Sequence, residues 1–293
     1  MKIKTAVIPV AGKGTRFLPA TKETPKEMIP ILTKPMIHYV VEEAVHSGID
    51  KIVFVSSSTK NSIVKYFDRN AGLEAFLKDA GKDKEFELIK NIGDMIEVVT
   101  VMQKEQLGLG HAVLCAESVV KDDYFSVILG DDLIFNKEEA VTNQLIKESE
   151  RLGGASVIGV MEVDPSLTYK YGIVQGDFTD ESKKTLKMEK MVEKPKPENT
   201  PTNLATPGRY VLSQQIFDVL HKIPRGVGGE YQLTDAINEL CSGGNVYAHV
   251  FNGKRYDTGT LPGYLEATVD LALEDEATRE YMQSLIKDRY AKL

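Results

Sequence analysis

The residues best suited to chemistry gather near the start of the chain. An apolar run, Ala6–Val10, leads directly into Ala11-Gly12-Lys13-Gly14-Thr15-Arg16. Gly12 and Gly14 carry no Cβ atom, so the loop backbone can approach a ligand closely. Cationic side chains follow the glycines and suit the oxygens of phosphate groups; they are Arg16, Lys22 and Lys26. The pattern predicts a buried strand that opens into a polyphosphate-binding loop.

Two better-known glycine motifs do not match this loop. A dinucleotide fingerprint needs a third glycine and an acid after the second strand. Phe17 stands at the place of that glycine, and the strand predicted over Ile52–Val55 ends in Ser56-Ser57-Ser58-Thr59. A Walker P-loop needs four residues between its first glycine and Gly-Lys-Ser/Thr, which this loop lacks. An ordinary surface turn with nearby charges remains as the alternative.

Two acids are candidates for holding a metal ion. Asp131 directly follows the apolar run Ser126–Gly130, and ligands of open α/β sheets bind at the carboxyl ends of strands. Asp257, in Tyr256-Asp257-Thr258-Gly259, likewise follows a strand-and-turn stretch. Two carboxylates together with phosphate oxygens and water suit Mg²⁺. The alternative for Asp131 is a helix-cap or turn role, which we expect for Asp132 instead.

Other polar side chains suit a base and a sugar phosphate. Gln103 follows the strand predicted over Ile96–Met102, and its amide both donates and accepts, as the edge of uracil or thymine requires. Glu193 can accept hydrogen bonds from neighbouring hydroxyls, and Lys194 can neutralise a phosphate. A charged strand end without a ligand is the alternative for this pair. The five histidines form neither His-x-His nor His-Glu-x-x-His spacing.

Composition limits the class of protein. The 293 residues include 36 Lys and Arg against 43 Asp and Glu, a formal net charge of −7. This balance argues against general nucleic-acid binding. Cys115 and Cys241 show no metal-type spacing and fit buried thiols in a reducing compartment. We find no signal peptide and no apolar run of about 20 residues that could span a membrane, and we expect a cytoplasmic enzyme.

The order of predicted elements indicates an α/β fold. Strands alternate with amphipathic helices in the first half, as in a Rossmann-like, doubly wound, mostly parallel sheet. Thr59 is expected to cap a short helix, and the charged residues 68–94 are expected to form a helical insertion. The second half contains short strands between turn-rich segments and predicts a mixed sheet. The chain is predicted to end in helices, over residues 261–293.

Further stretches carry a resemblance over nearly the whole chain. Gly12-x-Gly14-Thr15-Arg16 followed by Pro25-Lys26-Glu27-Met28 resembles the signature of the sugar-1-phosphate nucleotidyltransferases, and more narrowly of the bacterial UTP–glucose-1-phosphate uridylyltransferases. Stretches similar to that family follow in the family's order: Gln103–Ala112, Leu129–Asp132, Tyr171-Gly172, Val192–Pro195, Asn203–Ala205, Gly208-Arg209-Tyr210, Glu230–Ala236 and Tyr256–Gly259.

The resemblance implies a nucleotidyltransferase fold with a sugar-binding extension. The chain would be one domain, with residues 1–165 mainly binding nucleotide and 166–260 mainly binding sugar. The substrates would be UTP and α-D-glucose 1-phosphate, and the products UDP-glucose and pyrophosphate. A thymidylyltransferase or a related enzyme for another sugar 1-phosphate is the near alternative. A non-catalytic nucleotide-sugar sensor is the distant one. We expect a homo-oligomer, a dimer or tetramer.

The resemblance also implies roles for single residues. The catalytic set would be Arg16, Lys26 and Lys194, and the magnesium ligands would be Asp131 and Asp257. The nucleotide would be bound by Ala11, Gly12, Gly14, Thr15, Gln103 and Gly108. The sugar would be bound by Tyr171, Gly172, Glu193 and Lys194. Gln106 stands where many relatives have proline, so we expect a looser base-binding loop.

Overall fold

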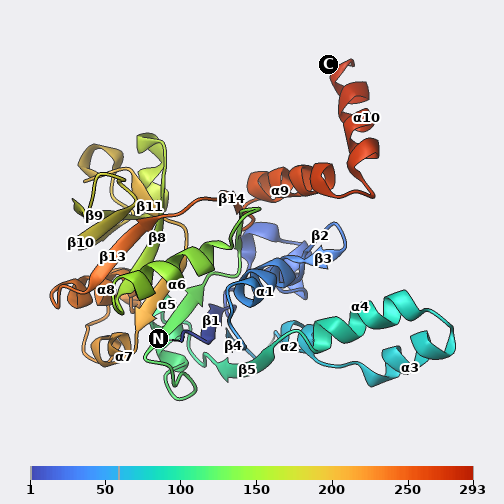
Figure 1. Ribbon diagram of the computed structural model, residues 1–293, viewed down its shortest axis with the longest axis horizontal. Coiled ribbons are helices and arrows are strands. Elements are labelled where there is room, and N and C mark those ends of the chain that lie inside the picture. The colour runs from blue at the N-terminus through green and yellow to red at the C-terminus, as the bar shows by residue number, and fades with distance from the viewer. Residues whose placement is uncertain (1, 59, 293) are drawn as a thin grey trace.

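A ten-stranded sheet runs through the computed structural model, which describes residues 2–58 and 60–292. Helices cover both faces of this sheet (Figure 1). In spatial order the strands are β11 (Leu204–Thr206), β9 (Gly172–Phe178), β10 (Thr185–Glu193), β13 (Val246–Val250), β8 (Ser156–Glu162), β12 (Arg209–Ser213), β6 (Tyr124–Ile128), β1 (Thr5–Pro9), β4 (Lys51–Ser56) and β5 (Glu97–Met102).

The two ends of the sheet are built differently. Strands β6, β1, β4 and β5 run parallel to one another, whereas β9, β10, β11 and β12 introduce antiparallel pairs. The helices are α1 (Met36–His46), α2 (Asn61–Phe67), α3 (Ala71–Asp79), α4 (Asp83–Gly93), α5 (Leu109–Cys115), α6 (Val141–Arg151), α7 (Gln215–Leu220), α8 (Leu233–Cys241), α9 (Leu261–Glu274) and α10 (Arg279–Tyr290). The predicted doubly wound α/β fold with a mixed second half is confirmed.

The apolar core lies in two layers, one on each face of the sheet. Successive side chains of a strand point to opposite faces, so Val7 of β1 packs in one layer while Ala6 and Ile8 pack in the other. Helices α5, α7 and α8 cover the first layer, and α1, α2, α6 and α9 cover the second. Burial on both faces explains why these strands have almost uninterrupted apolar sequences.

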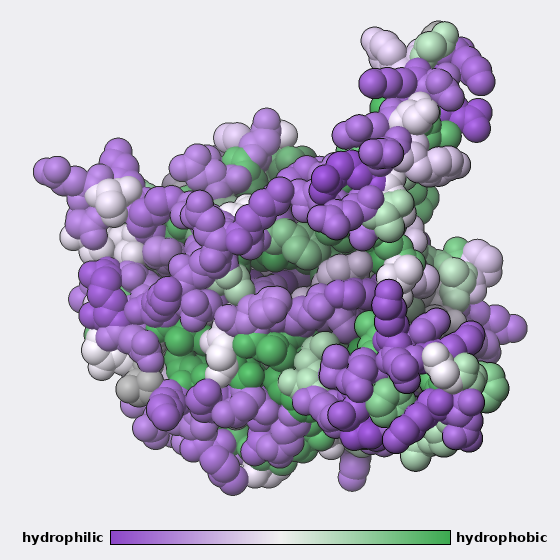
Figure 2. Space-filling view, turned by 45° about the vertical axis from the view of Figure 1, so that its right-hand side comes forward, coloured by the Kyte–Doolittle hydropathy of each residue, from purple (hydrophilic) through white to green (hydrophobic). Residues whose placement is uncertain are grey.

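The charged insertion and the chain end extend away from the sheet. Helices α3 and α4 form an arm beyond α2, and α10 projects beyond α9 (Figure 1). The predicted helical insertion over 68–94 is confirmed, but the cap expected at Thr59 lies outside the described residues. The face seen in Figure 2 is mostly hydrophilic, with apolar atoms mainly in its hollows. None of the described helices is long and apolar enough to cross a membrane.

Sequence patterns missed two small sheets, one formed by β2 (Pro30–Ile31) and β3 (Lys34–Pro35) and the other lying near the predicted metal ligands. Strand β7 (Asp132–Phe135) pairs antiparallel with β14 (Lys254–Asp257), outside the main sheet. Its register places Asp257 opposite Asp132. Each strand has only four residues, too few to show a period-2 pattern clearly. The pairing brings a segment near the chain end to the carboxyl end of β6.

Helix α1 carries a carboxylate with a low pKa. Glu42 Oε1 lies 2.7 Å from Lys34 Nζ and 3.0 Å from His38 Nε2. Burial acts to raise the pKa of Glu42, but His38 and Lys34 lower it to about 2. A depressed folded-state pKa stabilises the protein above the unfolded-state pKa, and this stabilisation disappears as pH falls toward 2.

Glu42→Gln should therefore reduce the amount by which the free energy of unfolding falls at low pH. Between pH 6 and pH 3 the free energy of unfolding should fall by about 1–2 kcal/mol less in the variant than in the wild type. Urea unfolding at both pH values measures this difference. Glu97→Gln is the control, because Glu97 forms only a looser, exposed 3.5 Å pair with Lys51. Equal acid sensitivity of wild type and Glu42→Gln would contradict the assignment.

Candidate functional site

The glycine loop forms one wall of a cavity of about 210 Å³. Its lining comes from segments far apart in the sequence: the loop itself, the turn after Pro25, the end of β6 and the turn after β14. The lining residues are Gly12, Lys13, Gly14, Thr15, Arg16, Phe17, Lys26, Asp131 and Gly259. The structure thus places the predicted phosphate-binding loop beside one predicted metal ligand. Lys22, expected among the cations of the loop, is exposed and outside this lining.

Local backbone geometry explains why this loop needs glycine. Gly14 has φ 65° and ψ 30°, in the left-handed region that other residues rarely adopt. A methyl group on Gly14 would lie 3.2 Å from Lys26 Cβ. Thr21 Oγ1 donates to Gly14 O at 2.6 Å and so fixes the loop against the following turn. Nothing lies within 4 Å of the position a Gly12 methyl group would take, so this side of the loop is open.

The carboxylates of Asp131 and Asp257 converge at Gly259. A methyl group on Gly259 would lie 2.9 Å from Asp131 Oδ2 and 3.3 Å from Asp257 Oδ1. The β7–β14 register brings the two acids together, and Thr258 Oγ1 donates to Asp131 O at 2.8 Å. Among the described residues there is no group of three or more metal-ligating side chains. A two-carboxylate set nevertheless fits a hard divalent ion that also takes phosphate oxygens and water as ligands.

Lys26 lies in direct ion-pair contact with Asp131. Burial would lower the pKa of Lys26, but Asp131 and Glu27 raise it above its usual value. Burial would likewise raise the pKa of Asp131, and Lys26 instead holds it below its usual range. Both groups are therefore charged at neutral pH. Beneath them, the buried Glu27 accepts from Lys60 Nζ at 2.8 Å, which anchors the turn that carries Lys26.

Gln103 lines a second cavity, of about 470 Å³, which shares Lys13 with the first. Its Nε2 donates to Gly108 O at 3.2 Å and lies 3.1 Å from His111 Nδ1. Since a carbonyl can only accept, the amide nitrogen is held inward and the amide oxygen remains for a ligand. Gln106 Nε2 donates to Ala11 O at 2.7 Å. Gln106 thus ties the two loops together, and the looser base-binding loop expected from it stays a prediction.

The predicted sugar residues meet where β9 and β10 pair. Glu193 lies opposite Gly172 in the register, and Lys194 N donates to Tyr171 O at 2.9 Å. Glu193 Oε1 accepts from Lys194 Nζ at 2.7 Å, and its Oε2 accepts from Thr234 Oγ1 at 2.8 Å. Lys194 has φ 47°, a strained value for a residue with a side chain. These residues line neither the 210 Å³ nor the 470 Å³ cavity.

Arg255 connects the sugar residues to the acids, and sequence reasoning missed it. Its Nη1 donates to Tyr171 Oη at 2.8 Å, and its Nη2 lies 3.7 Å from Asp257 Oδ2. Its Nε also donates to Asp132 Oδ1 at 2.5 Å. Asp132 is the first residue of β7, and its carboxylate forms an ion pair with Arg255. The helix-cap or turn role expected for Asp132 is therefore wrong. The one sequence signal that could have identified Arg255 is its position two residues before Asp257.

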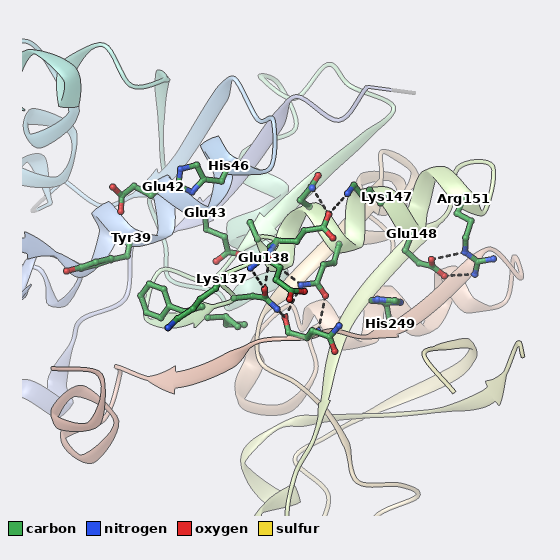
Figure 3. A pocket seen from close by; sticks show the side chains of 18 residues that line it. Tyr39, Glu42, Glu43, His46, Lys137, Glu138, Lys147, Glu148, Arg151 and His249 are labelled. Atoms are coloured by element: carbon green, nitrogen blue, oxygen red, sulfur yellow. Dashed lines mark hydrogen bonds and ion pairs between the residues drawn. The ribbon is translucent and has the colours of Figure 1, made fainter. Parts of the chain in front are cut away.

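A larger cavity, of about 840 Å³, lies between α1, α6 and the loop after β7. None of the predicted site residues lines it. Many of its charged groups are already paired with each other, as Glu148 is with Arg151 and as Glu139 is with Lys147 (Figure 3). The smaller cavity combines an open glycine loop with two lining cations, Lys13 and Arg16, that form no ion pair among the described residues, which makes it the better phosphate site.

Comparison with known proteins shows the family to which the chain belongs. The family model described as nucleotidyl transferase matches residues 5–274. The chain belongs to this family. It is 46% identical over 286 residues to UTP–glucose-1-phosphate uridylyltransferase 2 of Staphylococcus saprophyticus, covering 98% of each chain. The resemblance inferred from the motifs is confirmed.

Solved structures of nucleotidyl transferases are similar over the same length. The UTP-bound UDP-glucose pyrophosphorylase of Acinetobacter baumannii superposes with a TM-score of 0.87 at 41% identity, covering 97% of this chain and 99% of that one. A UDP-glucose pyrophosphorylase complexed with UDP-glucose gives 0.85 at 36% identity, covering 94% and 100%. The expected nucleotidyltransferase fold is confirmed.

Proposed function

We propose that the chain transfers the uridylyl group of UTP to α-D-glucose 1-phosphate, giving UDP-glucose and pyrophosphate. The observation that carries this proposal is the convergence of Asp131 and Asp257 beside the Gly12–Arg16 loop. A binding protein for a finished nucleotide sugar needs no such pair of acids. The names of the full-length relatives support the same substrates and an enzyme rather than a sensor.

The nucleotide would occupy the two neighbouring cavities, which share Lys13 in their linings. The loop backbone at Gly12, Gly14 and Thr15 would bind the triphosphate, with Arg16 and Lys26 neutralising its charge. The free amide oxygen of Gln103 would accept from the N3–H of uracil. Ala11 and Gly108 would contribute backbone groups, because a carbonyl that accepts from Gln106 or Gln103 keeps a second lone pair for the ligand.

Asp131 and Asp257 would hold a divalent metal ion, as nucleotidyltransferases of this kind generally require, and we propose Mg²⁺. Both ligands are hard oxygen donors, which Mg²⁺ prefers. When bound, such an ion stabilises negative charge on phosphate oxygens. Lys26 would also stabilise negative charge on the phosphate oxygens, because its ammonium lies beside Asp131 in the same cavity.

The sugar phosphate would approach from the β9–β10 side. Glu193 would accept from sugar hydroxyls, with Tyr171 and Gly172 beside it, while Lys194 would neutralise the 1-phosphate. A phosphate oxygen of glucose 1-phosphate would attack the α-phosphorus in line, and the bond to the departing pyrophosphate would break. The nucleophile is already ionised, so no proton transfer is needed and cations and positioning would supply most of the catalysis.

A pyrophosphate-release assay with glucose 1-phosphate and each of UTP, dTTP, CTP, ATP and GTP tests this function. UTP should give the highest kcat/KM. A higher value with dTTP would favour the thymidylyltransferase alternative. Binding of UDP-glucose without pyrophosphate release from any nucleotide would favour the sensor.

Glu193→Gln should separate the two substrates. The variant keeps the size of the side chain but loses the charge that strengthens hydrogen bonds from sugar hydroxyls, so KM for glucose 1-phosphate should rise about tenfold while KM for UTP changes little. Steady-state kinetics with each substrate varied in turn measures both. Glu189→Gln is the control, because Glu189 lies on the same strand and contacts Gln175 at an exposed site. Equal losses for both substrates would contradict a sugar-specific role.

Three broader expectations stay predictions. They are the division into a nucleotide part (1–165) and a sugar part (166–260), the cytoplasmic location, and assembly into a homo-oligomer. Exposed Tyr281 and Tyr290 on the projecting α10 support the last of these. Size-exclusion chromatography with light scattering measures the subunit number directly.

A further inference from the structure

The turn that carries Asp131 is held by a completely buried arginine. Arg209, at the start of β12, has a relative exposure of 0%. Its Nη2 donates to Asp132 O at 2.7 Å, and its Nη1 donates to Leu129 O at 3.3 Å. These two carbonyls flank Gly130 and Asp131, so one guanidinium bridges both ends of the turn.

Glu43 of α1 in turn fixes the guanidinium. Arg209 Nε donates to Glu43 Oε1 at 3.0 Å, and Nη2 donates to Oε2 at 2.8 Å. Thr142 of α6 donates to Glu43 Oε1 through its hydroxyl at 2.7 Å and through its backbone N–H at 3.2 Å. Figure 3 shows Glu43 reaching from α1 into the wall of the large cavity. The pair thus connects α1, α6 and β12 to the end of β6.

Stability alone is a poor explanation for this pair. Removing two charges from water is costly, and well-packed apolar residues often replace buried ion pairs without loss of stability. A guanidinium, however, offers several donors in a fixed plane, which lets it bind a carboxylate and two carbonyls at once. A lysine has one nitrogen and could not hold both carbonyls in the same way.

We propose that the Arg209–Glu43 pair positions Asp131 for metal binding. This rests on the proposed function of Asp131. Thr258 Oγ1 binds Asp131 O from the β14 side, so the main chain around Asp131 is held from two directions. Arg209 lines neither the 210 Å³ nor the 470 Å³ cavity, so its effect would pass through the turn.

Arg209→Lys tests the proposal with Mn²⁺ as the probe. Residues that support metal ligands typically change metal affinity or activity about 10- to 100-fold when replaced. We expect Mn²⁺ affinity, measured by electron paramagnetic resonance, and kcat both to fall within that range, while circular dichroism stays native. Ser149→Ala is the matched control. It removes another buried hydrogen bond, to Ala155 O at 2.6 Å, away from the site, and should lower the thermal midpoint only.

Four results would count against the proposal or its basis. A folded Arg209→Lys with Mn²⁺ affinity and kcat within about twofold of wild type overturns the proposal, as does an equal loss in Ser149→Ala. If Arg209→Lys does not fold, Glu43→Gln replaces it. This variant keeps the side-chain size and should weaken Mn²⁺ binding in the same direction, and unchanged binding overturns the proposal. Asp131→Asn is the reference: if it binds Mn²⁺ normally, the metal role of Asp131 itself is wrong.

Discussion

Asp131→Asn should lower kcat by about 10³-fold or more and leave the protein folded. Asparagine has the same shape as aspartate but lacks the charge that binds a cation. Asp131 and Asp257 are the two carboxylates facing one point at Gly259, so loss of one should also abolish tight Mn²⁺ binding. Pyrophosphate release at saturating UTP and glucose 1-phosphate gives kcat, and electron paramagnetic resonance gives Mn²⁺ affinity.

Asp270→Asn is the control for this variant. Asp270 of α9 also binds a lysine, Lys254, and accepts from Tyr256 Oη at 2.8 Å, but it does not line the phosphate cavity. Its replacement should leave kcat within about threefold of the wild type, the range expected for a surface change. Near-normal turnover of folded Asp131→Asn would refute the metal assignment.

Lys26→Ala should lower kcat about 10²- to 10³-fold, the usual cost of removing a preorganised charge that stabilises the transition state. The ammonium lies on Asp131 inside the cavity of the glycine loop, where negative charge would grow during transfer. Unlike Asp131→Asn, Lys26→Ala should not weaken Mn²⁺ binding. Removing a cation from the carboxylate leaves Mn²⁺ affinity without nucleotide unchanged or higher. Single-turnover kinetics and Mn²⁺ binding together distinguish the two roles.

Lys22→Ala is the matched control for Lys26→Ala. Lys22 lies four residues earlier in the chain but is exposed and does not line the cavity. It should change kcat by less than about threefold. A Lys26→Ala variant with raised KM values and a normal kcat would limit Lys26 to substrate binding.

Local patterns in the sequence were sufficient to predict much of the candidate site. The glycine loop, Gln103 and Asp131 each follow an apolar strand of the parallel half. The carboxyl ends of such strands meet at one edge of the sheet. Finding these residues required only the recognition of strands β1, β5 and β6. The insertion over 68–94 was equally readable, because its charged and apolar residues alternate at helical spacing.

The roles of other residues depended on partners far away in the chain. Asp132 looked like a turn residue until Arg255, 123 residues later, was found bound to it. Arg209 lies 166 residues from Glu43, and nothing near it in the sequence indicates a buried charge. Lys60 and Glu27 likewise form their pair across 33 residues. A local pattern carries no information on such contacts.

The sequence by itself determined the doubly wound core, the glycine loop that we propose to bind phosphate, and the acid at the end of β6. These follow from side-chain periodicity and glycine chemistry, which act over a few neighbouring residues. Only the tertiary structure decided that Asp257 faces Asp131, since this depends on the pairing of two four-residue strands, β7 and β14. It also brought Arg255 and Arg209 into contact with the segment that carries Asp131 and Asp132. A strand or a charged side chain has many chemically equivalent candidate partners along the sequence. Which of them it contacts depends on how the whole chain packs.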